Sequence, residues 1–351
     1  MQYKDVSRDL EKKTNLLVDS TMKCVYGDKL KDIKGSDKEE KSIRDIEYII
    51  NYLSEAAYFN NKGLFEDFSL WLNSLFNNID LGEEVFKTTY KCIIKQIEHE
   101  FDEKVSNYLN NIIRESMQEA LNNKEEIASF IKKDNPHQEY AKRYLDLLLE
   151  HKKEQASKLI TDEALDEMGI ADIYLNIFQP VQKEVGRLWH ANKVSVAKEH
   201  YISSVTQLIM SQLYPHFLSI GGKKGSVVTT AVGNELHEIG IRMIADLLEV
   251  DGYDTIHLGA NTPNTGIIQT LKSNKTKLLG VSVTLPLHLK ELDKLITMIR
   301  DERELNNLKI MIGGCAFNRN PELVNEFDVD EYSKDAQDAV KKANILTGVV
   351  N

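Results

Sequence analysis

The chain has 351 residues, of which 42% are hydrophobic and 28% charged, the composition of a globular protein with room for two or three domains. Its 55 acidic and 44 basic residues give a net charge of −11, which argues against direct binding to nucleic acid or to an anionic membrane. No segment has the roughly 18 consecutive apolar residues of a membrane span, and the polar residues 1–16 do not form a secretory signal. We therefore expect a cytoplasmic protein.

The three cysteines are Cys24, Cys92 and Cys315, and they lie far apart in the chain. Their spacing matches neither a zinc site nor a disulfide framework. The sequence therefore predicts three reduced thiols.

Residues 1–134 are predicted to form an N-terminal helical domain, because apolar residues recur three and four positions apart from Ile43 to about Leu121. The region resembles neither a winged helix nor a helix-turn-helix, and no face collects Lys and Arg. Since it also lacks catalytic features, we expect a sensory or partner-binding role.

A group of aromatic residues stands out in this domain. Aromatic side chains normally dominate the core of a helical bundle, and this is the favoured interpretation. The alternative is a second ligand pocket, for example for a bilin. The residues are Tyr48, Tyr52, Tyr58, Phe59, Phe65, Phe68, Trp71 and Phe76.

Residues 135–220 are predicted to form an antiparallel four-helix bundle, because helical segments of similar length are joined by short connections. Asn135-Pro136 marks the boundary before the bundle, and Pro180 predicts a kink inside the third helix. The four predicted helices span about 137–149, 151–167, 170–190 and 195–217.

The end of the third helix and the start of the fourth carry Trp189, Val196 and Glu199-His200. Trp189 and Glu199-His200 form a W-x9-E-H pattern. Because this pattern closes one helix and opens the next, we expect these side chains around a single inter-helix turn.

Residues 223–351 alternate between strand-like and helical runs, which predicts an α/β domain with five parallel strands in a doubly wound, flavodoxin-like (Rossmann-type) sheet. The predicted strands span 226–232, 254–258, 277–283, 308–313 and, weakly, 328–332.

The loop after the first strand reads Glu235-Leu236-His237-Glu238-Ile239-Gly240. In an open parallel sheet this loop lies at the carboxyl edge of the strands, where ligands bind. There, Glu235 is expected to hold one nitrogen of the His237 ring and fix its tautomer. Two further motifs, Ser282-x-Thr284 and Gly313-Gly314, end later strands.

Together, E-x-H-x-x-G, S-x-T and G-G resemble the cobalamin-binding domain shared by methionine synthase, corrinoid carrier proteins and cobalamin-dependent mutases. The resemblance implies that His237 is the lower cobalt ligand and that Ser282, Thr284, Gly313 and Gly314 line the channel for the nucleotide tail. It also implies that the rest of the His loop contacts the cofactor: Glu235, Glu238, Ile239 and Gly240. The family usually has Asp where this chain has Glu235.

From about residue 137 onward the chain resembles the adenosylcobalamin-dependent photoreceptors of the CarH type, but residues 1–134 are not their DNA-binding domain. The resemblance implies a cap bundle over the upper face of cobalamin, with Trp189, Val196 and Glu199 around the adenosyl group. It further implies that His200 ligates cobalt after light breaks the Co–C bond. His190 is a candidate for contacts with a partner protomer.

The leading interpretation is a non-enzymatic photoreceptor that binds adenosylcobalamin and acts on a transcription regulator or signalling protein, through the N-terminal domain or a changed homo-oligomeric state. One alternative is a corrinoid carrier for methyl transfer, the corrinoid subunit of a methyltransferase system. Another is a photosensor with both cobalamin and a bilin. The sequence leaves open the partner, the dimer or tetramer state, and whether light or cofactor level is the signal.

Overall fold

The computed structural model describes residues 2–123, 127–217 and 224–349, and the chain divides into two compact units, Met1–Glu126 and Ile127–Asn351. Among the residues described, none of the helices is both long and apolar enough to cross a membrane. The predicted fold class is confirmed: an all-α region is followed by a helical bundle and then by a five-stranded parallel α/β domain.

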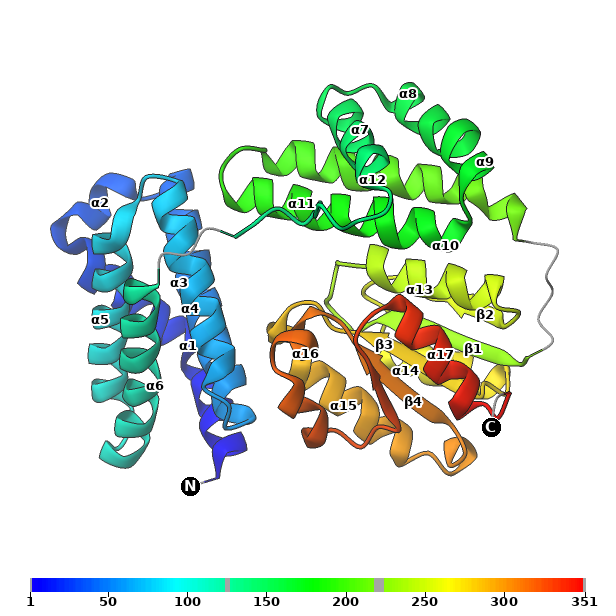
Figure 1. Ribbon diagram of the computed structural model, residues 1–351. Coiled ribbons are helices and arrows are strands. Elements are labelled where there is room, and N and C mark those ends of the chain that lie inside the picture. The colour runs from blue at the N-terminus through cyan, green and yellow to red at the C-terminus, as the bar shows by residue number, and fades with distance from the viewer. Residues whose placement is uncertain (1, 124–126, 218–223, 350–351) are drawn as a thin grey trace. The chain divides into compact units, whose positions relative to one another are not determined.

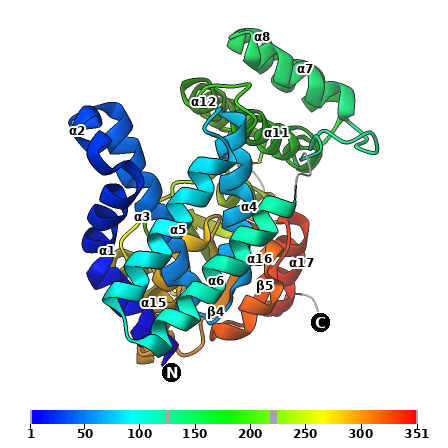
Figure 2. The same cartoon turned by 90° about the vertical axis from the view of Figure 1, so that its left-hand side faces the viewer.

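The first unit is a bundle of helices that lie side by side (Figures 1 and 2). Two of these helices begin at side-chain caps: Ser36 Oγ accepts a hydrogen bond from the Glu39 N–H, and Asp102 accepts one from the Val105 N–H. The helices are α1 (Tyr3–Tyr26), α2 (Leu30–Ile33), α3 (Asp37–Tyr58), α4 (Gly63–Asn78), α5 (Gly82–Glu100) and α6 (Glu103–Asn122), with a 3₁₀ turn at Gly27–Lys29.

Most of the predicted aromatic cluster fills the core of this first unit. Phe65 is fully buried, and the rings of Tyr52 and Phe68 stack with their centroids 3.9 Å apart. Tyr48, by contrast, is 44% exposed. Because the rings pack against one another, the core interpretation of the cluster is confirmed for its buried members.

The prediction of three reduced thiols is wrong for two of the cysteines. Cys24 on α1 and Cys92 on α5 form a disulfide, with their Cα atoms 5.8 Å apart, whereas Cys315 is free and exposed. Spacing along the chain could not reveal this pair, because the two residues are 68 positions apart and meet only when α1 packs against α5.

The second unit begins with the four-helix bundle, called the cap below. It starts earlier than the expected boundary at residue 135, because the backbone N–H of Phe130 donates a hydrogen bond of 2.9 Å to Glu184. The expected boundary at 220–223 lies outside the described residues. The cap comprises α7 (Gln138–Leu149); α8 (Lys153–Lys158), a π-helical turn (Leu159–Ala164) and α9 (Leu165–Glu167); α10 (Ile170–Asp172), η3 (Ile173–Phe178) and α11 (Gln179–His190); and α12 (Val196–Leu213) with η4 (Tyr214–His216).

The irregularity expected at Pro180 takes the form of a π-helical segment, η3, just before it. Proline has no N–H to donate, so the carbonyl of Asn176, four residues earlier, loses its usual helical partner. The Asn135 side chain replaces that partner, donating from Nδ2 to the Asn176 oxygen at 2.7 Å.

The sheet has the strand order β2-β1-β3-β4-β5, the flavodoxin-like order predicted from the sequence. Helices α13 and α17 cover one face, while α14 and α15 cover the other (Figure 1). The strands are β1 (Ser226–Ala231), β2 (Asp254–His257), β3 (Leu278–Ser282), β4 (Lys309–Gly313) and β5 (Glu331–Ser333). The helices between and after them are α13 (Ile239–Val250), α14 (Asn264–Ser273), η5 (Pro286–His288), α15 (Leu289–Arg300), η6 (Arg303–Leu305), α16 (Cys315–Arg319), η7 (Pro321–Glu326) and α17 (Ala336–Leu346).

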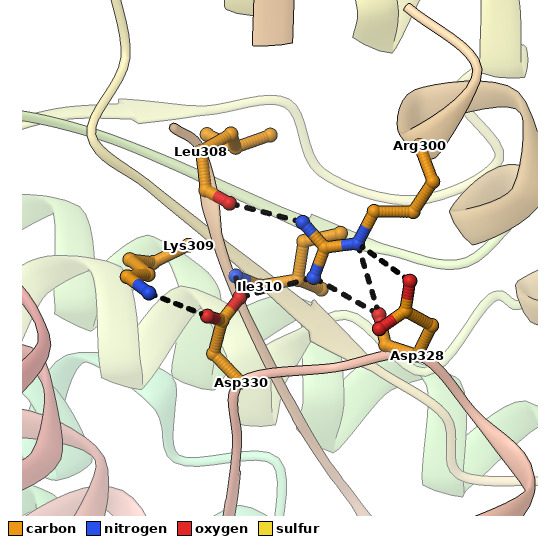
Figure 3. A network of polar contacts seen from close by, with 6 residues as sticks. All are labelled: Arg300, Leu308, Lys309, Ile310, Asp328 and Asp330. Carbon is orange, nitrogen blue, oxygen red and sulfur yellow. Dashed lines mark hydrogen bonds and ion pairs between the residues drawn. The ribbon is translucent and has the colours of Figure 1, made fainter. Parts of the chain in front are cut away.

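A polar network fixes the amino end of β4, opposite to the edge that carries the sequence motifs (Figure 3). The Arg300 guanidinium donates to the carbonyl oxygens of Leu308 and Asp328 and to the carboxylate of Asp330. Asp330 also accepts hydrogen bonds from Lys309 Nζ at 2.7 Å and from the backbone N–H of Ile310 at 2.9 Å. The network ties α15 and the segment before β5 to β4.

Candidate functional site

The centre of the site is the contact between Glu235 and His237 in the loop after β1. The Glu235 carboxylate is completely buried, and its Oε1 lies 2.5 Å from Nδ1 of His237 and accepts a hydrogen bond of 3.0 Å from the His237 N–H. The His237 side chain is 58% exposed. Within the described residues no hydrogen bond reaches its Nε2, so this nitrogen is available to a ligand.

The second carboxylate oxygen of Glu235 reaches the loop that follows β3. Its Oε2 accepts hydrogen bonds from the backbone N–H groups of Thr284 at 3.0 Å and Leu285 at 2.9 Å. One buried carboxylate therefore joins the E-x-H-x-x-G motif to the S-x-T motif. The longer side chain of Glu, compared with the usual Asp, spans from the His loop to these two amides.

Glu235 and His237 shift each other's pKa. Burial alone would raise the pKa of Glu235, but its hydrogen bonds to His237 and to backbone amides lower that pKa to about 2. The hydrogen bond to Glu235 raises the pKa of His237 against the effect of burial, and the charges of Glu235 and Glu199 add to the rise. Glu199 belongs to the cap helix α12, so the cap acts electrostatically on His237.

The strand register brings the other predicted motifs to the same edge of the sheet. Ala231, Ser282, Gly313 and Ser333 stand opposite one another in turn at the carboxyl ends of β1, β3, β4 and β5. All four have small side chains, so this edge leaves room above the strands. Thr284 follows directly after this row.

Backbone packing explains why Gly313 and Gly314 are glycines. A Cβ atom on Gly313 would lie 2.8 Å from the Ser333 carbonyl oxygen, and one on Gly314 would collide with the Val283 carbonyl oxygen. Gly314 also has φ +110, a conformation that other residues rarely adopt. The glycines are thus required by the close approach of β4 to its neighbours, whatever else they contact.

Gly240 differs, because within the described part of the chain no atom beyond its chain neighbours and its own helix backbone lies within 4 Å of the place where its Cβ would be. It is exposed in the first turn of α13, and Leu236, on the other side of His237, is 74% exposed. The protein itself therefore gives no steric reason for this glycine. Open space beside an apolar side chain and a free imidazole nitrogen fits the close approach of a large, flat ligand.

The two remaining predicted residues of the loop, Glu238 and Ile239, face the rest of the unit. Glu238 Oε1 accepts a hydrogen bond from Gln207 of the cap at 3.3 Å, and its Oε2 accepts one from the Ala260 N–H at 2.9 Å. Ile239 packs against the core of the cap. These residues anchor the loop between the cap and β2.

The cap places its predicted residues around one turn, as the pattern predicted. Trp189 is half-buried near the end of α11, while Val196, 52% exposed, begins α12 after the capping residue Ser195. His200 is 73% exposed, and its Nδ1 lies 2.5 Å from Oε2 of Glu199. As with Glu235 and His237, a carboxylate oxygen contacts Nδ1 of the ring, but Glu199 is 29% exposed whereas Glu235 is buried.

His190 lies inside the fold. Its side chain is only 5% exposed, and burial, together with the charge of Arg319 on α16, lowers its pKa. This burial distinguishes His190 from a residue on a surface that a partner protomer contacts.

The donor set fits a corrinoid better than a bare metal ion. Among the described residues, no group of three or more His, Cys, Asp or Glu side chains is placed to hold a metal ion. A single imidazole, oriented by a carboxylate, suits a metal that a macrocycle already holds. His237 Nε2, with Nδ1 of the same ring held by Glu235, has the chemistry of such a ligand.

Several contacts around the site were not predicted from the sequence. They include the hydrogen bond from Gln207 to Glu238, the backbone donors at Thr284 and Leu285, and the bond from Tyr174 Oη to Asp246 at 2.8 Å. No local pattern marks them, because each depends on how segments distant in the chain dock.

Two segments of the chain match protein families that are both described as a B12 binding domain, at residues 140–214 and 225–341. The dimethylamine corrinoid protein of Methanosarcina barkeri is 23% identical over 214 residues, which cover 60% of this chain and 98% of that protein. Monomethylamine corrinoid protein 1 of Methanosarcina acetivorans is 25% identical over 197 residues, or 53% of this chain and 88% of that protein.

The solved structure of the Methanosarcina barkeri monomethylamine corrinoid protein has the same fold. It aligns with a TM-score of 0.53 at 19% identity and covers 61% of this chain and 100% of that protein. This likeness shows the shared fold, and the two B12-binding segments with the corrinoid relatives support a cobalamin-binding family for this chain.

Proposed function

We propose that this protein is a corrinoid carrier for methyl transfer, with His237 as the lower ligand of a bound cobalamin and a methyltransferase as its partner. The observation that carries the proposal is the buried Glu235, which leaves Nε2 of His237 open at the carboxyl edge of the sheet. Relatives of this chain are named as dimethylamine and monomethylamine corrinoid proteins, which favours methyl transfer over light sensing.

In this proposal the Glu235–His237 pair controls the basicity of the ligand. Glu235 Oε1 accepts a hydrogen bond from Nδ1–H, so the lone pair of His237 is on Nε2, and the negative charge of Glu235 makes that nitrogen a stronger electron-pair donor to a metal. The corrinoid, when bound, supplies a cobalt centre that takes up a methyl group and gives it to an acceptor. The row of small residues Ser282, Gly313 and Ser333 then receives the nucleotide tail.

The cap has to admit the partner for transfer to occur. Its contacts with the α/β domain combine apolar packing, in which Met243 and Leu247 of α13 join the core of the cap, with hydrogen bonds such as those of Gln207 with Glu238 and Tyr174 with Asp246. We propose that the cap covers the upper face of the corrinoid and swings away when a methyltransferase binds.

The test starts from full-length protein loaded in the dark with methylcobalamin and desalted. We expect wild type to retain the cofactor with a histidine as lower ligand, whereas His237→Ala releases it. His288 lies outside the His237 loop, on the η5 turn, so His288→Ala serves as the control and should retain the cofactor. Light then cleaves the Co–CH3 bond, which releases a methyl radical and leaves Co(II) cobalamin; titanium(III) citrate supplies one electron to give Co(I), and methyl iodide is added. The methyl group passes from iodide to the reduced cobalamin, and the methyl form should return.

Failure of wild type to retain cobalamin would contradict binding through His237. Retention without re-methylation would leave the cobalamin site intact and contradict the carrier role.

A second candidate is the adenosylcobalamin light sensor, which the Glu199–His200 pair favours. His200, like His237, has its Nδ1 on a carboxylate and an exposed ring, as an upper ligand would require. Under this candidate, green light on the adenosylcobalamin-loaded protein yields a stable bis-imidazole spectrum that His200→Ala abolishes. The exposed His151→Ala serves as control. A carrier would show no such His200-dependent product.

A further inference from the structure

A cavity of about 370 Å³ lies in the second unit, and His237 does not line it. Its walls come from both parts of the unit: Ser211 and Tyr214 belong to the end of the cap, whereas Arg242, Asp246 and Glu249 belong to α13. The β2 strand closes it from a third side. The volume falls near the lower end of the range of about 300–1,000 Å³ for small-molecule pockets.

The cavity carries charges of both signs that are not paired with one another. Arg242 donates to the Ser211 hydroxyl at 2.7 Å, and within the described residues no carboxylate lies at ion-pair distance from it. Asp246 and Glu249 accept hydrogen bonds from the Tyr174 and Tyr214 hydroxyls at 2.8 and 3.0 Å, and neither forms an ion pair in the described part of the chain.

These three side chains are only partly exposed, so their charges are incompletely solvated. Partly buried charges of opposite sign that stay apart favour a ligand with complementary charges at two points. Arg242 offers its guanidinium to a carboxylate, and the neighbouring Asp246 and Glu249, one turn apart on α13, offer carboxylates to an ammonium group.

The β2 wall adds two uncharged side chains, each with one polar atom that has no hydrogen bond within the described residues. The Thr255 hydroxyl is buried without a hydrogen bond. His257 uses Nδ1 in a contact of 3.0 Å with Thr229 Oγ1 and has no hydrogen bond at Nε2. A buried hydroxyl without a partner costs free energy, so its presence on the wall of a cavity points to a polar ligand.

We propose that this cavity binds a small zwitterion of the amino-acid class. The carboxylate of the ligand pairs with Arg242, its ammonium group lies against Asp246 and Glu249, and Thr255 and His257 hydrogen-bond its polar atoms. Because the ionised carboxylates outnumber the guanidinium, an amino acid with a second ammonium group binds more tightly than one with a second carboxylate. Since the cap and α13 both form the walls, the ligand also holds these two elements together.

Isothermal titration calorimetry on the full chain without cobalamin tests this site apart from the proposed carrier function. The probes are L-lysine, glycine and L-glutamate, with acetate and methylammonium as single-charge controls. We expect L-lysine to bind best, glycine next and L-glutamate least, and each single-charge compound to bind at least about tenfold more weakly than L-lysine.

Arg242→Gln and Glu249→Gln should each weaken L-lysine binding by about tenfold or more. Gln at position 249 still accepts the hydrogen bond from Tyr214, so this variant is expected to fold even if Arg242→Gln does not. Arg143→Gln and Glu163→Gln remove an exposed ion pair elsewhere in the cap and should leave binding unchanged. Absence of heat with all three amino acids would overturn the proposal. So would unchanged binding in a folded Glu249→Gln variant.

Discussion

The Nδ1 atom of His237 lies 2.5 Å from the Oε1 atom of Glu235, whose other carboxylate oxygen accepts hydrogen bonds from the Thr284 and Leu285 amides. Every hydrogen-bonding group that faces this carboxylate is a donor. The buried charge therefore determines both the tautomer of His237 and the position of the loop after β3.

Replacing Glu235 with Gln should disrupt both sides of this contact. The NH2 group of Gln would face donors on one side, either at His237 or at the two amides, because an amide has only one acceptor oxygen. We expect cobalamin affinity to fall by about 10–100-fold in a dark equilibrium titration. Glu326→Gln, an exposed change of the same kind, should leave the affinity unchanged. Equal affinities of wild type and Glu235→Gln would contradict the role of the pair.

Two glycine substitutions separate a structural from a ligand-contacting role. Gly314→Ala should lower the thermal midpoint of unfolding strongly, because its Cβ collides with Val283 and its φ is +110. The Cβ of Gly240→Ala meets no neighbouring atom among the described residues, and Ala favours a helix over Gly, so its midpoint should be at least that of wild type. Gly240→Ala should nevertheless weaken cobalamin binding by about tenfold if the ring lies against this turn. Normal cobalamin binding by Gly240→Ala would place the ring elsewhere.

Asp246 gives the stability of the second unit a pH dependence. Burial and the charge of Glu249 raise its pKa to about 6, against the lowering effects of the Tyr174 hydrogen bond and of Arg242. The folded state therefore holds its proton more tightly than the unfolded state, whose pKa is near 3.8. This contribution stabilises the fold at low pH and is lost as the pH rises through about 6.

Asp246→Asn removes the free-energy cost of ionising this buried carboxyl group. Its side-chain oxygen still accepts the hydrogen bond from Tyr174. At pH 8 the free energy of unfolding of the variant should exceed that of wild type by about 1–2 kcal/mol, and the variant should unfold at a higher temperature. The difference should shrink at pH 5. A difference between the two proteins that is the same at both pH values would contradict the raised pKa.

Arg300 should be important for stability but not for cobalamin binding. Arg300→Ala removes the side-chain donor to the carbonyl oxygens of Leu308 and Asp328 and leaves the Asp330 carboxylate with only Lys309 and the Ile310 N–H among its described donors (Figure 3). We expect a loss of about 2–3 kcal/mol in urea unfolding followed by far-ultraviolet circular dichroism. The exposed Arg303→Ala, three residues further along the chain, should change little. A stability of Arg300→Ala equal to that of Arg303→Ala would show that the network contributes little.

The parts of this protein that follow local rules could be predicted from its sequence. Alternating periodicities gave the parallel sheet, and the carboxyl ends of its strands bring Glu235, Ser282 and Gly313 to one edge in the observed register. The second set of bonds made by Glu235 could not be predicted, because it depends on backbone amides that have no sequence signature. The Cys24–Cys92 disulfide depends in the same way on helix docking.

The sequence motifs could not decide between a light sensor and a methyl carrier. The Trp189 and Glu199-His200 pattern led to a light sensor as the main interpretation, whereas the relatives named as methylamine corrinoid proteins favour the methyl carrier. Both functions use the same His237 site, so motifs that describe the site do not separate them.

The most direct test of the central claim is electron paramagnetic resonance of the protein loaded with cobalamin and reduced to the Co(II) state. If Nε2 of His237 is the lower ligand, protein with 15N-labelled histidine should show a doublet nitrogen splitting in place of the triplet of unlabelled protein, and His237→Ala should lose the protein-derived splitting. A triplet that persists in the labelled protein would mean that the nucleotide base of cobalamin, rather than His237, binds the metal.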